Sequence, residues 1–298
     1  MAVGDLQAGS AGIRKEVIDS IVKQTAARTY KFKQACAIVP TSAWTNDFFR
    51  EDLTVLAGQT GNSFRGVRPG AAFPQASINV ERVSGEIIAF KAEENIPWET
   101  GRASQFDIQA RTVIRLTEGI VKEVDDYIWE ELTESRTMTG VIQSFAILNH
   151  RHWNVASAAI IDDVKKASQL ISTNGNYDTT NLICFISPRD ERSIMNYIAD
   201  KGAQWMPAAQ DAMRNGTIGQ IAGVTFVTSQ SVTASYALVV KPKTCATIQE
   251  FVPLTTNITD DPLKSWRLRV VEELQVQLTD PKAIVLIKDT QGSADNLS

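Results

Sequence analysis

The sequence feature that most constrains the fold is a long helical pattern between residues 105 and 135. Apolar side chains recur there at steps of three and four, which places them on one face of a helix. These residues are Val113, Leu116, Ile120, Val124, Ile128 and Leu132. At 1.5 Å per residue such a helix is roughly 45 Å long, more than one compact domain needs. We therefore expect one long helix on which later segments of the chain pack.

The opposite face of this predicted helix is acidic. It carries Glu118, Glu123, Asp125, Asp126, Glu130, Glu131 and Glu134. Carboxylates on one face could ligate a hard divalent cation, but nothing in the sequence pairs with them from another element. A solvated face, or a face between subunits, is the favoured interpretation.

Length, composition and net charge limit the class of protein to which this chain can belong. The length of 298 residues predicts about two domains, and a hydrophobic content of 43% is enough for a sizeable core. The net charge of −4 gives no indication of tight nucleic-acid binding. No apolar run approaches 18 residues and the N-terminus lacks a signal pattern, so we expect neither a membrane span nor secretion.

The three cysteines are Cys36, Cys184 and Cys245. They lie far apart among apolar or small neighbours, without the spacing of a metal site. We predict buried, inert thiols in a reducing compartment.

Residues 1–40 are predicted to form a weakly amphipathic helical arm in which basic residues, among them Arg14 and Lys15, outnumber acidic ones. The arm could face phosphate or an acidic neighbour, or it could be a solvated helix. Because so thin a segment cannot bury its apolar stripe alone, it needs a partner surface.

Residues 41–100 are predicted to form a long projecting hairpin. Strand patterns at 51–57 and 76–92 flank a glycine- and proline-rich stretch, 58–75, that has no periodicity. This stretch is too long for a tight hairpin turn. A projecting hairpin has open edges and little core of its own, so it indicates assembly with other chains.

Residues 156–250 resemble a compact α/β unit. A helical pattern begins at Ile160 and ends near Gly175, which is available for a left-handed cap. The run LICFI at 182–186 predicts a buried strand, and Ser187 followed by Pro188 predicts the start of a second helix. Two further strands are expected at 224–228 and 236–240.

The longest strand pattern lies in residues 251–290. Apolar residues occupy even positions from Trp266 to Leu278, and Glu272 alone breaks the series. This alternation predicts a half-buried antiparallel strand, bent near Glu272. We expect Ala283 to Ile287 to pair back after a turn, and the sheet to pack on the long helix.

Catalytic motifs are weak throughout the sequence. It contains no G-x-S-x-G elbow and no phosphate-binding glycine–lysine loop. His150 and His152 could form half of a zinc site on a strand, but a third ligand is not evident, so structural histidines are favoured. We expect no enzymatic activity and no cofactor.

The order of these parts resembles the major capsid protein of tailed double-stranded DNA viruses, the α+β fold called Hong Kong 97-like. The stretches most similar to that family are LICFISPRDERSIMNYIADKG, GTIGQIAGVTFVTS and the run Val239-Val240-Lys241-Pro242. The resemblance implies five regions. They are an N-terminal arm at 1–40, an extended hairpin called the E-loop within 41–100, the spine helix and start of the peripheral domain at 101–149, an axial domain at 150–245, and the peripheral sheet with its tail at 246–298.

The resemblance implies a structural shell protein. Copies would assemble as hexamers and pentamers into an icosahedral capsid, in the host cytoplasm, around double-stranded DNA held without sequence specificity. A separate scaffold, a portal and cement proteins are possible partners, and no membrane is involved. The candidates for contact between subunits are Arg14, Lys15, Arg65, Arg68, Arg82, Glu123, Asp126 and Glu130.

Two alternatives stay open at this point. One is an encapsulin-like compartment, which is a shell of the same fold that encloses enzymes in place of a genome. The other is an oligomeric enzyme with a metal site made by His150, His152 and the acidic helix face.

Overall fold

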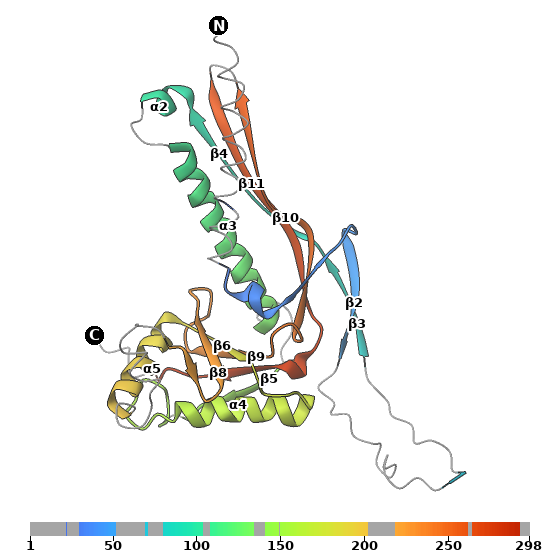
Figure 1. Cartoon of the computed structure of the whole chain (residues 1–298), viewed down its shortest axis with the longest axis vertical. Helices are drawn as coiled ribbons and strands as arrows, with labels where there is room; N and C mark the ends of the chain where they lie inside the picture. The colour runs from blue at the N-terminus through green and yellow to red at the C-terminus, as the bar shows by residue number, and fades with distance from the viewer. Residues whose placement is uncertain are drawn as a thin grey trace.

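A computed structural model shows a mixed α+β protein built from two sheets, one long helix and a projecting hairpin (Figure 1). The structure describes residues 22, 30–51, 69–70, 80–103, 108–133, 141–148, 150–201, 218–261 and 264–292.

The four-stranded sheet has the strand order β1-β10-β11-β4. These strands are β1 (Ala37–Pro40), β10 (Ala246–Asp261), β11 (Ser265–Leu278) and β4 (Ile88–Pro97). Strand β11 runs antiparallel to both neighbours, whereas β1 lies parallel to β10 at one edge.

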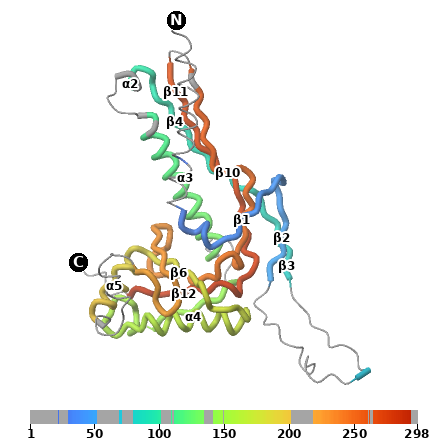
Figure 2. The backbone as a smooth tube through the Cα atoms, in the orientation of Figure 1, coloured from blue at the N-terminus to red at the C-terminus, as the bar shows by residue number. Residues whose placement is uncertain are grey.

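The predicted long helix is confirmed as α3 (Ile108–Thr133). Its apolar stripe packs on the even-numbered face of β11, where Leu268, Val270 and Leu274 are fully buried. Figures 1 and 2 show α3 running beside this sheet. The predicted packing of the C-terminal strand on the helix is therefore confirmed.

The prediction that β11 is half-buried holds only for its first half. From Glu272 to Leu278 both faces are buried, because the end of β3 covers the face that alternation left to solvent. An ideal Cβ placed on Gly85 of β3 would clash with the side-chain amide of Gln275, so this side chain lies directly against the Gly85 backbone. The irregularity expected near Glu272 lies in the neighbouring strand β10, where the register shifts between Glu250 and Thr255.

The second sheet has six strands in the order β5-β12-β9-β6-β8-β7. They are β5 (Gln143–Ala146), β6 (Leu182–Ile186), β7 (Gln220–Ile221), β8 (Val224–Thr228), β9 (Tyr236–Val240) and β12 (Ile284–Lys288). The expectation that residues 283–287 pair back on the long strand is wrong. A short turn, η2 (Pro281–Ala283), sends β12 into this second sheet, where it lies between β5 and β9.

Helices α4 (Ile160–Gly175) and α5 (Pro188–Lys201) pack on one face of the six-stranded sheet. Helix α5 begins as predicted: the Ser187 hydroxyl accepts a hydrogen bond from the backbone N–H of Asp190 at 3.1 Å. Helix α4 ends differently, because Asn176 and not Gly175 adopts the left-handed conformation, with φ of 54°. Asparagine tolerates this region better than most residues, so it caps the helix.

The projecting hairpin is confirmed in its described part. Strands β2 (Thr45–Glu51) and β3 (Val80–Glu86) pair with each other and extend away from the body (Figure 1). Chain direction then changes at Ile87, and β4 continues into the four-stranded sheet. Nearly all of the strand expected at 51–57 lies outside the described residues. A short helix, α2 (Trp98–Ala103), follows β4.

The predicted helical arm is wrong for residues 30–40. They form a short 3₁₀ turn, η1 (Phe32–Ala35), and then β1. Phe32 and Ala35 are fully buried in this chain's own core, so this segment needs no partner subunit.

Two apolar cores hold these layers together. One face of the six-stranded sheet packs on α4 and α5. Its other face, including Phe185 and Leu238, joins α3 and the four-stranded sheet in a single continuous core. None of the described helices has the length and apolar character needed to cross a bilayer.

Candidate functional site

Exposed apolar side chains lie on β1, on the hairpin and on the segment that connects them. They are Ile38 and Val39 on β1, Trp44 before β2, Phe49 on β2 and Val80 on β3. Phe49 is 66% exposed, which is far outside the range of a core residue. Strand β1 is also a sheet edge, and β2 and β3 form a sheet of only two strands. Unpaired edges bearing apolar side chains are typical of surfaces that another chain covers.

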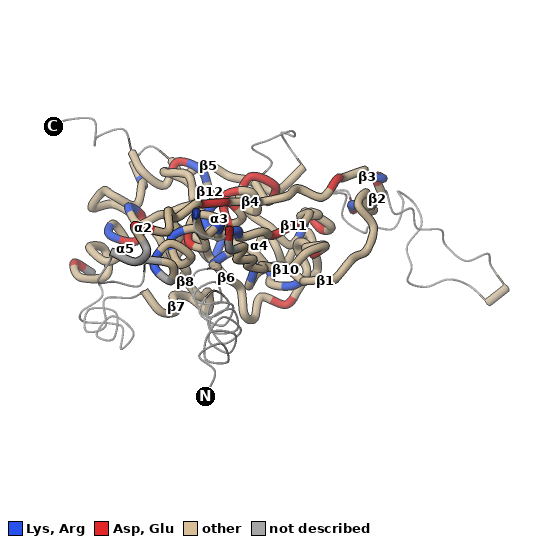
Figure 3. The backbone as a smooth tube through the Cα atoms, turned by 90° about the horizontal axis from the view of Figure 1, so that it is seen from above, with Lys and Arg blue, Asp and Glu red and all other residues tan. Residues whose placement is uncertain are grey.

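Figure 3 shows β2 and β3 extending sideways from the body, with acidic and basic residues interspersed along the rest of the tube. The hairpin also carries charged residues, and Arg82 of β3 is one of them. Its guanidinium donates to Asp47 of β2, with 3.0 Å between Nε and the carboxylate oxygen. This hydrogen bond holds the pKa of Asp47 below its ordinary value. Arg82 therefore tightens its own hairpin and presents a partly satisfied charge to solvent.

The other predicted contact residues divide into two groups. Glu123 and Glu130 are exposed on α3, and Asp126 is half-buried with its carboxylate 3.6 Å from the ammonium group of Lys122. The remaining candidates lie outside the described residues. They are Arg14, Lys15, Arg65 and Arg68.

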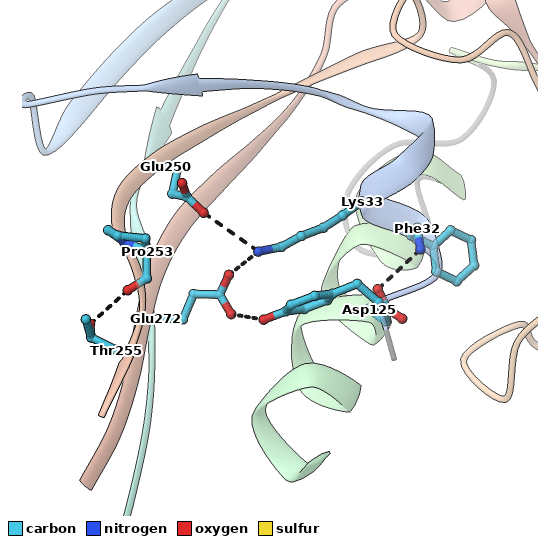
Figure 4. A network of polar contacts seen from close by, with 8 residues as sticks. Phe32, Lys33, Asp125, Glu250, Pro253, Thr255 and Glu272 are labelled. Carbon is cyan, nitrogen blue, oxygen red and sulfur yellow. Dashed lines mark hydrogen bonds and ion pairs between the residues drawn. The ribbon is translucent and has the colours of Figure 1, made fainter. Parts of the chain in front are cut away.

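A buried charge cluster lies where the N-terminal segment crosses the long sheet (Figure 4). The Glu272 carboxylate is fully buried and accepts hydrogen bonds from the Lys33 ammonium group and the Tyr30 hydroxyl. Glu250 lies 3.8 Å from the same ammonium group, which also sits over the Tyr30 ring. Burial and the Glu272 charge raise the pKa of Tyr30, so its hydroxyl stays protonated and donates.

Asp125 is the second buried carboxylate of this region. It accepts from the backbone N–H groups of Lys31 at 2.9 Å and Phe32 at 3.3 Å, at the start of η1. Burial raises the pKa of Asp125 to about 6 in spite of these bonds. Helical periodicity put Asp125 on the acidic face that was expected to be solvated or between subunits, and neither carboxylate was predicted to anchor another segment. The one signal in the sequence was Glu272, the only charge in an otherwise apolar series.

The histidines do not form the strand pair that a zinc site would use. His150 is exposed, whereas His152 is buried in a turn and its Nδ1 donates to the carbonyl oxygen of Asp289 at 2.6 Å. Within the described part of the chain, no group of three or more His, Cys, Asp or Glu is placed to hold a metal ion.

The prediction of buried thiols is confirmed. Cys36, Cys184 and Cys245 are all buried and free. Burial raises the pKa of each thiol, that of Cys245 to about 12. Thiolates are the reactive form, so these side chains are poor nucleophiles and poor metal ligands at neutral pH.

One groove among the described residues has a volume of about 750 Å³. It lies between α3, the start of α5 and the loop at 228–231, and its lining mixes Lys31, Arg115 and Lys122 with carboxylates. Arg115 and Lys122 are already paired with Glu118 and Asp126.

Comparisons with known proteins agree with this architecture. A family model described as phage capsid protein matches residues 96–287. The capsid structure of the cyanophage P-SCSP1u is similar with a TM-score of 0.65 and 13% identity, covering 87% of this chain and 88% of that one. A comparison with curated protein sequences gives no match.

Two more solved structures extend the likeness. The capsid of a native GTA particle has a TM-score of 0.64 and 14% identity, covering 88% of this chain and 91% of that one. A virus-like particle from Pyrococcus furiosus has a TM-score of 0.62 and 10% identity, covering 92% and 99%. At these identities the likeness shows the fold alone.

Proposed function

We propose, because this chain belongs to the phage capsid protein family, that its copies assemble as hexamers and pentamers into an icosahedral shell around double-stranded DNA. The chain is a structural major capsid protein with the Hong Kong 97-like fold, and its place is the virion. The arrangement in hexamers and pentamers and the enclosure of a genome are the parts of the function that we propose.

The observation that carries the proposal is the projecting hairpin with its exposed apolar side chains. Phe49 and Val80 lie on a two-stranded sheet, which is marginally stable in water by itself. A neighbouring copy would bury these side chains and close the open strand edges. Such repeated contacts between identical subunits generate closed assemblies.

Particular residues are proposed for these contacts. Arg82, with Glu123, Asp126 and Glu130 on α3, would pair with opposite charges of neighbouring copies. Arg65 and Arg68 would act from the hairpin, and Arg14 and Lys15 from the arm. In the same proposal the projecting part of residues 41–100, which includes β2 and β3, serves as the E-loop, and residues 150–245 together with β5 and β12 serve as the axial domain.

The enclosed DNA would be held by confinement and not by sequence-specific contacts. A net charge of −4 supports this view, because tight binding to phosphates needs a basic surface. Assembly would take place in the host cytoplasm, with a separate scaffold, a portal and cement proteins as possible partners. The protein would need no cofactor and catalyse no reaction.

The decisive experiment measures assembly of the purified protein by sedimentation and electron microscopy. The native chain is expected to form capsomers or megadalton particles. Phe49→Asp should keep the fold, because Phe49 is exposed, yet abolish particles, because a carboxylate would be buried at the contact. Leu148→Asp is the matched control, since Leu148 is 61% exposed but lies away from the hairpin.

Assembly that survives Phe49→Asp would refute the role of the hairpin, and a native chain that stays monomeric would refute the shell. The content of the particles separates the two kinds of shell. Packaged DNA supports the viral capsid, whereas a packaged enzyme would support the compartment. The phage description of the matching family favours the capsid.

A further inference from the structure

The short segment from Tyr30 to Cys36 contacts both sheets but belongs to neither. Phe32 is fully buried, and its ring centroid lies 5.7 Å from that of Trp129 and 4.4 Å from that of Phe185. Trp129 belongs to α3, which packs on the four-stranded sheet, and Phe185 belongs to β6 of the six-stranded sheet. One inserted ring therefore contacts both layers within the core that they share.

Polar contacts fasten this segment on the side of the helix and the long sheet. Asp125 of α3 accepts from two of its backbone N–H groups, and Lys33 pairs with the fully buried Glu272 of β11. Figure 4 shows Lys33 pointing to the sheet and Asp125 facing the start of η1. A buried carboxylate that loses its counter-charge is costly, so the contacts of Glu272 with Lys33 and Tyr30 resist displacement of this segment.

The same segment is fastened to the connection between the two sheets. The carbonyl oxygen of Ala35 accepts from the backbone N–H of Lys243 at 2.7 Å and from the thiol of Cys245 at 3.6 Å. Both residues lie between β9, in the six-stranded sheet, and β10, in the four-stranded sheet. The segment thus touches the helix, both sheets and their link.

We infer that residues 30–36 form a wedge that fixes the angle between the two sheets, and that this angle sets the curvature of the assembled shell. The second part rests on the proposed function. Removing a buried ring leaves a cavity that its surroundings fill only in part, so the two layers would shift toward each other. A direct hydrogen bond from the Trp129 indole to Thr233, at 3.0 Å, keeps the layers attached without the ring.

The test compares particle diameters of the native chain, Phe32→Ala and Phe90→Ala by electron microscopy. Phe90 is the control, because this half-buried ring packs on Tyr127 of α3 at a centroid distance of 5.7 Å, so its ring contact lies within one layer. Phe32→Ala is expected to shift or broaden the diameter distribution, and Phe90→Ala to leave it unchanged. Equal effects of the two variants, or no effect of either, would overturn the inference.

Two further measurements keep the test decisive. If Phe32→Ala does not fold, Phe32→Leu replaces it, with the same expected shift and the same overturning result. If the native chain forms no shell, the proposed function fails, but the wedge is still tested by small-angle X-ray scattering of the subunit. A changed distance distribution in Phe32→Ala, absent in Phe90→Ala, would support the wedge, and an unchanged one would overturn it.

Discussion

At the scale of single residues, Glu272 shows how one polar side chain can organise a core. It stands where the strand pattern calls for an apolar residue, and its burial is compensated by Lys33 and Tyr30 from a segment more than 200 positions away in the sequence. Sequence periodicity located the exception, but only the tertiary structure shows which groups neutralise it.

Lys33→Met should destabilise the protein by about 3–5 kcal/mol, because it leaves the Glu272 carboxylate buried without its counter-charge. The double variant Lys33→Met/Glu272→Met should recover most of that loss. Urea unfolding measures both. Arg82→Met is the control, since its exposed pair with Asp47 should contribute little. A double variant as unstable as the single one would contradict this account.

Asp125 gives a pH dependence whose sign follows from its burial. Its pKa is raised to about 6 from the model-compound value of 3.8. A raised folded-state pKa means that the folded protein binds this proton more tightly than the unfolded chain does. The resulting stabilisation is fully present below the unfolded-state pKa and is lost as the pH rises through 6. Between pH 4 and pH 7 the loss is on the order of 2 kcal/mol.

Asp125→Asn should therefore remove this part of the pH dependence. The expected result is a smaller difference in unfolding free energy between pH 4 and pH 7 than the native chain shows, measured by urea titration. Glu123→Gln, a change at an exposed position of the same helix, should leave the difference as it is. An identical pH profile for Asp125→Asn and the native chain would refute the assignment.

At the scale of elements, the predictions that succeeded depend on residues close together in the sequence, and those that failed depend on pairing with distant segments. Periodicity predicted α3, α4 and β11, and a local capping signal predicted the start of α5. The sheet to which β12 belongs depends on its pairing with β5, far back in the chain, which no local pattern encodes. The docking of η1 was missed for the same reason, and with it most of the buried charge cluster.

The base of the hairpin is fixed by the close approach of Gly85 and Gln275. Gly85→Ala should destabilise the protein by about 1–3 kcal/mol, because the new methyl group forces the buried Gln275 amide aside. Adding Gln275→Ala should relieve the clash. Gly119→Ala is the opposite case, because nothing lies within 4 Å of its ideal Cβ on an exposed helix position. It should stabilise the protein by up to about 1 kcal/mol.

Hydrogen–deuterium exchange of residues 80–86 provides the second measurement for Gly85→Ala. Faster exchange there than in the native chain is expected, since a displaced Gln275 weakens the packing of β3 on β11. If the exchange and the unfolding free energy both stay unchanged, the contact does not hold the hairpin.

At the scale of the whole molecule, the shared core predicts how the protein unfolds. One face of the six-stranded sheet, α3 and the four-stranded sheet form a single apolar cluster, so neither layer keeps its core when the other melts. We expect one cooperative transition, with coincident curves from tryptophan fluorescence and far-ultraviolet circular dichroism. The fluorescence should report both layers, because Trp129 lies in the shared core and Trp153 in the other. Two separated transitions would contradict the shared core.

The position of β12 bears on the order of events during synthesis. Its neighbours β5 and β9 are both made earlier, yet they do not touch each other and join only through β12. Until the ribosome has released residues 284–288, the nascent chain holds an open gap in the sheet. A chain that lacks residues 284–288 therefore cannot complete the six-stranded sheet, because nothing else pairs β5 with β9 among the described strands.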